Sequence, residues 1–305
     1  MTEEWHILAL IGVAAFAPGL FWLWYFFKKD EIEPEPLSHI RTTFVWGMAS
    51  VIPAAFMEKL VGLPDFWTLV VSAPVFEELF KFLAVFLTVY NNDEFDEPMD
   101  GIVYGATAAL GFASVENVIY LLREYRESAG AFALVSVLRS VISVPAHALF
   151  SIMWGYALGL AKFEDKAEHG KIIAVGLASA IGLHAAFNFF CTLGPLWIWA
   201  MLALVPLMWQ AAHRRMRSAL ARSPHAPPDG AASHMSRPPQ PILDADGKER
   251  WFENRVLVVL LLFLVCFPAG LYGLVKNTRF SMPEKLTLVL LWLMSTALVI
   301  ESALT

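Results

Sequence analysis

Long uninterrupted apolar runs are the feature of this chain that most restricts its fold. Nine stretches are mostly apolar over about 18 residues or more, the length that an α-helix needs to cross a bilayer. Only 16% of the 305 residues are charged, whereas a soluble domain carries about 25%. Because a lipid-exposed sheet edge cannot exist in hydrocarbon, we expect an all-α fold, a polytopic transmembrane helical bundle of about nine spans. The predicted spans are 5–27, 41–62, 66–90, 101–122, 131–161, 171–192, 195–212, 255–275 and 284–303.

Two of these runs need a further prediction. The first, over 5–27, follows an acidic rather than basic start and is longer than a signal-peptide core, so it is expected to be a retained span. The fifth, over 131–161, is too long for one straight crossing. Pro145 lies inside it and is expected to kink or break the helix, since proline lacks the backbone donor and clashes one turn back.

A change of composition divides the chain into three parts. The segment between Arg222 and Lys248 is rich in Pro, Ser, Ala and Gly, which is typical of a disordered linker. We therefore predict an intramembrane core over 1–215, a disordered cytoplasmic linker over 216–250 and a two-span tail over 251–305.

The distribution of Lys and Arg predicts the orientation of the spans. With the N-terminus outside, the inner loops hold fourteen Lys and Arg and the outer loops hold five. The positive-inside rule therefore favours an outside N-terminus and an inside C-terminus. The net charge of −6 argues against nucleic acid as a partner, so membrane lipid is the expected surroundings.

Ionisable side chains recur in four consecutive predicted spans, from the third to the sixth. An isolated charge at the bilayer centre costs at least about 2.5–3.5 kcal/mol, so these groups are expected to converge on one another rather than face lipid. The ionisable groups are Glu77, Glu78 and Lys81 in PVFEELFKF, Glu116 in GFASVENVIY, Arg139 and His147 in LRSVISVPAHALF, and His184 in GLHAAFNFF. Asn117 and Asn188 are polar residues of the same segments.

Helical spacing indicates how they can be arranged. Glu77 and Lys81 are four residues apart and share a helix face, while Glu78 points about 100° away and can serve another partner. His184 and Asn188 also share a face. Small residues in the fourth and fifth spans allow the close backbone approach that a buried polar cluster requires; they are Gly101, Gly105, Ala109, Gly155 and Gly159.

Two kinds of hydrolytic chemistry fit these residues. In one, a buried carboxylate acts as general base on a water, and an imidazole or amide such as His184 or Asn188 donates to the oxyanion. In the other, His147, His184 and one Glu hold a zinc ion with an open fourth position. No HExxH helix or Cys cluster is present, so the residues leave metal and metal-free mechanisms open.

Two other functions remain open at this point. Charged residues in spans also build proton relays and ion pathways, so an ion- or proton-coupled transporter is the main alternative. Such transporters commonly show two related halves, whereas here the polar groups occupy one block. Paired charges that only fix helix register are the structural alternative.

Four blocks of sequence resemble the PrsW family of intramembrane proteases, which cut membrane-anchored anti-sigma factors. EELFK at Glu77–Lys81 matches its EExxK motif, and the other blocks are DGIVYGATAALGFASVENVIY, HALFSIMWGYALG and HAAFNF, in the family's order. WYFFKKDEIEPEP, from Trp24 to Pro36, is similar to the stretch after the family's first span. The resemblance covers about residues 20–192 and excludes the linker and tail.

The resemblance implies an enzyme of the bacterial cytoplasmic membrane and a role for each matched residue. PrsW proteins are distantly similar to CAAX-prenyl proteases and bacteriocin-immunity peptidases. By that similarity Glu77 is the catalytic base, His147 helps to activate water, and His184 with Asn188 forms the oxyanion site. Glu78 and Lys81 are supports, and Glu116 is a further catalytic carboxylate. If the family's metalloprotease description applies, His147, His184 and Glu116 would bind Zn²⁺.

Overall fold

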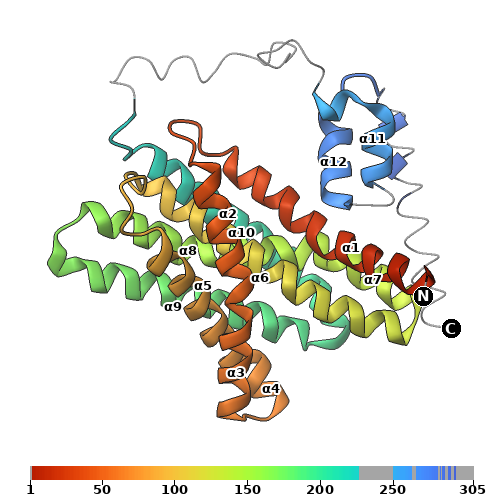
Figure 1. Ribbon diagram of the computed structural model, residues 1–305, viewed down its shortest axis with the longest axis horizontal. Coiled ribbons are helices and arrows are strands. Elements are labelled where there is room, and N and C mark those ends of the chain that lie inside the picture. The colour runs from red at the N-terminus through yellow and green to blue at the C-terminus, as the bar shows by residue number, and fades with distance from the viewer. Residues whose placement is uncertain are drawn as a thin grey trace. The chain divides into compact units, whose positions relative to one another are not determined.

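The computed structural model describes residues 2–226, 250–262 and 266–280 and a few positions between 282 and 292, and every regular element in these ranges is helical. The polytopic all-α prediction is therefore confirmed. The helices are α1 (Thr2–Phe27), α2 (Leu37–Ala49), α3 (Val51–Val61), α4 (Asp65–Trp67), α5 (Ala73–Thr88), α6 (Pro98–Glu127), α7 (Ala129–Leu138), α8 (Val144–Phe163), α9 (Lys166–Cys191), α10 (Trp197–Leu220), α11 (Arg255–Leu260) and α12 (Phe267–Lys276) (Figure 1). Short π and 3-10 segments are η1 (Thr68–Ser72), η2 (Arg139–Ser143), η3 (Gly194–Leu196) and η5 (Trp251–Glu253).

Six helical stretches in the described part of the chain are long and apolar enough to cross a membrane. They are Trp5–Phe27, Leu37–Val61, Pro98–Glu127, Ala129–Phe163, Lys166–Cys191 and Gly194–Leu220. The protein is thus an integral membrane protein, and the predicted count of about nine spans is not confirmed by these described residues. The predicted span over 66–90 is helical from α4 through α5, but its charged residues make it too polar to belong to the six by composition alone.

The helices form two compact units, described here separately. The first contains the described residues of Met1–Phe21, Asn117–Val141 and Pro227–Thr305, and the second contains Trp22–Glu116 and Ile142–Ala226. Helix α10 continues to Leu220, so the first residues of the predicted linker 216–250 are helical. The rest of that linker lies largely outside the described residues.

Glycines bring α6 into backbone contact with α8 in the second unit, as the small-residue spacing predicted. A Cβ atom at Gly101 would lie 2.1 Å from the carbonyl oxygen of Gly155, and one at Gly159 would lie 2.4 Å from that of Pro98. Further along α6, a Cβ at Gly111 would lie 2.2 Å from the carbonyl oxygen of Phe44 on α2. Helix α6 is therefore held between two neighbours at distances that admit no side chain.

Pro74 and Pro145 each lie just after a π-helical turn, and each precedes the polar residues of its own helix. η1 leads into α5, which has Pro74 in its first turn, and η2 leads into α8, which has Pro145 there. Proline lacks the backbone donor and crowds the preceding turn, and a wider turn accommodates both effects. The predicted disruption at Pro145 is a π turn inside a continuous stretch, Ala129–Phe163, rather than a break. Turns of this kind are frequent at functional sites.

The tail of the first unit differs from the prediction of one straight span over 255–275. Helices α11 and α12 are separate and pack against each other, with Val258 and Leu274 buried between them (Figure 1). A Cβ at Gly270 would lie 2.1 Å from the backbone nitrogen of Leu262. Pro268 begins α12, and the close approach at Gly270 lets the two helices fold back. The predicted ninth span, 284–303, lies mostly outside the described residues.

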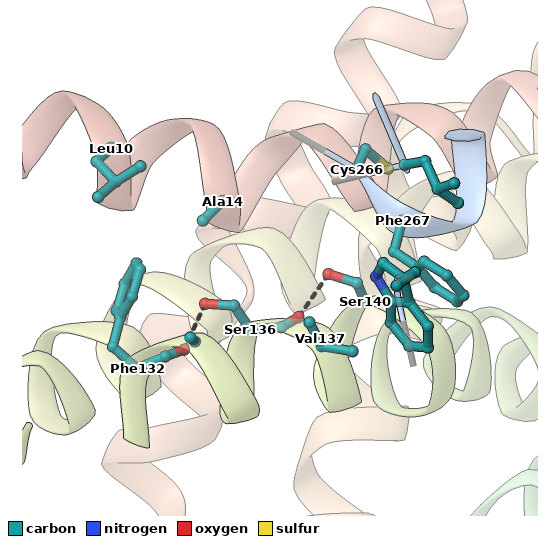
Figure 2. A pocket seen from close by; sticks show the side chains of 11 residues that line it. Leu10, Ala14, Phe132, Ser136, Val137, Ser140, Cys266 and Phe267 are labelled. Carbon is teal, nitrogen blue, oxygen red and sulfur yellow. Dashed lines mark hydrogen bonds between the residues drawn. The ribbon is translucent and has the colours of Figure 1, made fainter. Parts of the chain in front are cut away.

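The same unit contains a pocket lined by α1, α7 and the tail (Figure 2). Its serine hydroxyls are bonded to their own helix: Ser136 donates to the Phe132 carbonyl at 2.7 Å and Ser140 to the Ser136 carbonyl at 2.6 Å. The remaining lining is apolar apart from the Cys266 thiol. The lining of this pocket is therefore mainly apolar, and we assign no catalytic group to it.

Candidate active site

Polar residues of four helices meet in one buried cluster within the second unit. Glu77, Glu78 and Lys81 lie on α5, Glu116 on α6, His147 on α8 and His184 on α9. Glu78 and Lys81 have no exposed surface, and Glu77, His147 and His184 are also buried. The predicted convergence of polar groups from these four segments is what the structure has.

Lys81 lies at the centre of the carboxylates. Its Nζ is 2.9 Å from Glu78 Oε1, 3.2 Å from Glu77 Oε2 and 3.0 Å from His147 Nδ1. The ring of Phe112 lies 4.2 Å from the same nitrogen, in cation–π geometry. One ammonium thus offsets much of the cost of burying two carboxylates on the same helix.

Glu78 is surrounded by hydrogen-bond donors. Ser151 Oγ donates to Glu78 Oε2 at 2.8 Å and Trp154 Nε1 donates to the same oxygen at 3.0 Å. The other oxygen lies 2.9 Å from Lys81 Nζ and 3.1 Å from His184 Nδ1. Both oxygens are therefore occupied, and this carboxylate is placed to hold its neighbours in position.

Each histidine lies between two different carboxylates. His147 Nε2 is 2.9 Å from Glu116 Oε2, and its Nδ1 is 3.9 Å from Glu77 Oε2. His184 Nδ1 is 3.1 Å from Glu78 Oε1, and its Nε2 is 3.9 Å from the same Glu77 oxygen. Glu77 is thus the carboxylate that both imidazoles share, while Glu116 and Glu78 each bond the far nitrogen of one ring.

Glu77 and the two histidines lie close enough together to hold a metal ion. One ligand atom each from Glu77, His147 and His184 lies within 4.8 Å of the other two. Two imidazoles and a carboxylate are a common donor set for zinc. The predicted set of His147, His184 and Glu116 differs in its third member, since Glu116 lies on the opposite nitrogen of His147.

Glu116 is the most exposed carboxylate of the cluster. Its side chain keeps 18% of its surface, against 9% for Glu77 and none for Glu78. Glu116 is therefore the carboxylate of the cluster with the largest exposed surface.

Asn188 is placed differently from the other predicted residues. It lies one turn after His184 on α9, is half-buried, and donates from Nδ2 to the Leu69 carbonyl of η1 at 2.9 Å. This bond uses one of the two N–H groups of the amide and joins α9 to η1.

Sequence reasoning missed Ser151, Trp154 and Phe150. The first two lie four and seven residues after His147, so they share its helix face and the spacing alone could have identified them. Phe150 stacks on His184 with ring centroids 4.5 Å apart. This contact joins α8 to α9, and no pattern within either helix indicates it.

Comparison with known proteins gives the cluster its context. The model of the PrsW family intramembrane metalloproteases matches residues 35–211, more than half of the chain. Among curated relatives, Protease PrsW of Geobacillus kaustophilus is 37% identical over 70% of this chain and 95% of the relative. Those of Bacillus subtilis (32%; 68% and 94%) and Clostridioides difficile (30%; 69% and 89%) also match. No solved structure matches the chain.

These relatives decide between the functions that the charged helices left open. A match over nearly the whole length of several proteases favours hydrolysis over ion transport or a purely structural cluster. The chain belongs to the PrsW family and is an intramembrane protease.

Proposed function

We propose that Glu77, His147 and His184 bind a zinc ion, and that this buried cluster hydrolyses a peptide bond of a membrane-anchored protein. The observation that carries the proposal is the two-sided contact of each imidazole. One nitrogen faces Glu77 at 3.9 Å, and the other lies within 3.1 Å of a different carboxylate. Histidines that bind metals usually donate their second nitrogen to a carboxylate in this way, which fixes the ring and its tautomer.

The surrounding residues would serve the reaction by holding these groups. Glu78, bonded by Ser151 and Trp154, keeps His184 turned toward Glu77. Glu116 would hold His147 turned toward Glu77 in the same way. Because Glu116 is the more exposed carboxylate, it could also exchange a proton with water. A bound zinc ion would supply a hydroxide at neutral pH and polarise the attacked carbonyl.

One observation favours a metal-free alternative, in which Glu77 acts as general base on water. Lys81 Nζ already lies 3.2 Å from Glu77 Oε2 and 3.0 Å from His147 Nδ1. Its positive charge occupies the neighbourhood that a metal ion would need. In that mechanism His184 would donate to the oxyanion, and Asn188 could join it through the amide N–H that does not bond the Leu69 carbonyl.

The proposed substrate is a single-span protein of the anti-sigma-factor kind, presented as an extended strand. A helical segment keeps its carbonyls in its own hydrogen bonds, so the scissile bond must lie where the helix is frayed or unwound.

The proposed orientation has the N-terminus outside and the C-terminus inside. A reporter that works only in the cytoplasm, fused to the C-terminus of this chain, should therefore be active. An inactive fusion would contradict this orientation.

The decisive experiment uses the full chain, purified in detergent, on a tagged single-span substrate. Zinc content is measured beside cleavage for the wild type, Glu77→Gln, His184→Ala and Glu116→Gln. Glu168→Gln on α9 is the matched control, because its side chain is exposed and pairs with Lys171 at 3.4 Å. The same substitution there should change neither quantity.

Each outcome separates the two mechanisms. One zinc per chain, lost in Glu77→Gln and His184→Ala but kept in Glu116→Gln, supports the proposed ligand set. Full cleavage by a metal-free preparation supports the glutamic mechanism. A Glu77→Gln protein that cleaves at the wild-type rate would contradict both, since the shared carboxylate would then have no part in the reaction.

A further inference from the structure

A second cluster of buried carboxylates lies where the loop after α1 meets the start of α6. Asp30 belongs to that loop, Glu97 immediately precedes α6, and Asp100 lies in its first turn. Their exposed fractions are 3%, 0% and 1%. One oxygen from each lies within 4.8 Å of the other two. Residues from two separate segments thus bring three buried carboxyl groups close together.

Most of these oxygens have no hydrogen-bond donor. Both oxygens of Asp30, both of Glu97 and Oδ1 of Asp100 are buried without a partner. The remaining oxygen, Asp100 Oδ2, accepts from the backbone N–H groups of Asp96 at 2.7 Å and Glu97 at 2.8 Å. A buried charge without compensation costs several kcal/mol, so this arrangement requires a positive partner or bound protons.

The charge of Asp100 acts on Lys162 of α8 from a distance, but no side-chain cation of the described residues forms a close pair with the cluster. Neither Lys nor Arg forms an ion pair with Asp30, Glu97 or Asp100 in the ranges described. Lys162 on α8 directs its ammonium to the carbonyl oxygens of Tyr90 and Asn92, at 3.0 and 3.2 Å.

A fourth buried carboxyl group, that of Glu35 in the same loop, lies beside Asp100, and the Tyr104 hydroxyl donates to it. Several ionised carboxylates cannot share this space unless a cation joins them.

We propose that Asp30, Glu97 and Asp100 form a binding site for a divalent cation, with Ca²⁺ the preferred ion. Together they offer five unpartnered oxygens, and Ca²⁺ takes six to eight oxygen ligands in flexible geometry. Mg²⁺ prefers to keep several waters, which this buried space accommodates poorly. The absence of imidazole or thiolate among the three ligands disfavours zinc.

The site is separate from the peptidase cluster and independent of its mechanism. Asp100 and Glu116 are sixteen residues apart on α6, which corresponds to about 24 Å along the helix. A cation would join the loop between α1 and α2 to the start of the helix that carries Glu116. Its expected effect is on the stability of the fold, so its test does not require peptidase activity.

A neighbouring trio provides the control. Glu33 Oε2 and Asp96 Oδ1 lie 3.2 and 3.1 Å from His225 Nε2. These exposed carboxylates already have a partner and lie beside the proposed site. Glu33→Gln therefore removes a nearby charge without removing a proposed ligand.

The experiment measures cation binding and thermal unfolding of the full chain in detergent, after treatment with a chelator. Ca²⁺ and Mg²⁺ are added in separate series, with binding followed by equilibrium dialysis. We expect one Ca²⁺ per chain and a rise of several degrees in the unfolding midpoint, since a ligand that binds only the folded state stabilises it. Glu33→Gln should behave as the wild type.

The double variant Asp30→Asn, Glu97→Gln makes the proposal falsifiable. It should lose the bound Ca²⁺ and the Ca²⁺-dependent shift, yet unfold at or above the midpoint of the chelated wild type, because neutral amides remove the repulsion. If it fails to fold, Glu97→Gln alone must lower Ca²⁺ affinity by at least tenfold. Absence of saturable Ca²⁺ or Mg²⁺ binding by the wild type would show that protons alone occupy the cluster. Unchanged binding by the variants would place the ion elsewhere, and either result overturns the proposal.

Discussion

A single methyl group added at Gly155 should push α8 away from α6 and disable the active site. The Cβ of Gly155→Ala would lie 2.3 Å from the carbonyl oxygen of Gly101 and 3.0 Å from its carbonyl carbon. Ordinary carbon–oxygen contacts are about 3.3–3.6 Å, so the helices must separate by about 1 Å. The atoms in the way are backbone, so no side-chain rotation can relieve the clash.

The consequence for the site follows from what the two helices carry. His147 on α8 and Glu116 on α6 are joined by a 2.9 Å contact between Nε2 and Oε2. A shift of about 1 Å would break that contact, and misplacements of this size can lower rates about 100-fold. Forcing extra volume into a packed core typically costs about 1–3 kcal/mol. We therefore expect Gly155→Ala to lower both the thermal midpoint and the cleavage rate.

The assay compares unfolding and cleavage of the purified variant with those of Gly182→Ala. In the described structure, no atom lies within 4 Å of a Cβ built at Gly182 on α9, which also carries His184. This matched substitution should leave cleavage unchanged and, because alanine favours the helix by about 0.5–1 kcal/mol, should not destabilise the fold. Wild-type cleavage and stability in Gly155→Ala would refute the view that glycine contacts set the geometry of the site.

Three further substitutions test the contacts inside the cluster. Ser151→Ala removes a donor from the buried Glu78 carboxylate and should lower stability by about 1–3 kcal/mol in a thermal unfolding assay. Ser179→Ala is the control, because its hydroxyl bonds the Val175 carbonyl of its own helix, and it should change the stability very little. Lys81→Met leaves two buried carboxylates without their cation and should destabilise by about 3–5 kcal/mol, so wild-type abundance and midpoint would contradict the central role of this ion pair. Glu116→Gln should lower the cleavage rate by about 10–100-fold while the zinc content stays the same; loss of the zinc instead would make Glu116 a direct ligand.

Much of the site could be predicted because helical periodicity is local. The pairing of Glu77 with Lys81 follows from a spacing of four residues. The convergence of His147 and His184 on the same carboxylates follows from the cost of leaving a charge in hydrocarbon. Those arguments need only the residues of each helix and the polarity of its surroundings.

The count of spans could not be obtained in the same way. Hydropathy treats 255–275 as one run, but Pro268 and Gly270 divide it into α11 and α12, which pack on each other. Proline at a helix start and glycine at a close approach act through geometry that average hydropathy does not contain.

The sequence by itself determined that this protein is helical and membrane-embedded and which polar residues lie on which helix, and its similarity to the PrsW family identified it as a protease. Only the tertiary structure decided that Glu77, rather than Glu116, faces both imidazoles, and that Asp30 meets Glu97 and Asp100. The physical reason is that the helical repeat relates residues within one helix. The rotation and axial shift of one helix against another depend on packing, as at Gly101 and Gly155. These two quantities decide which carboxylate of one helix faces an imidazole of another.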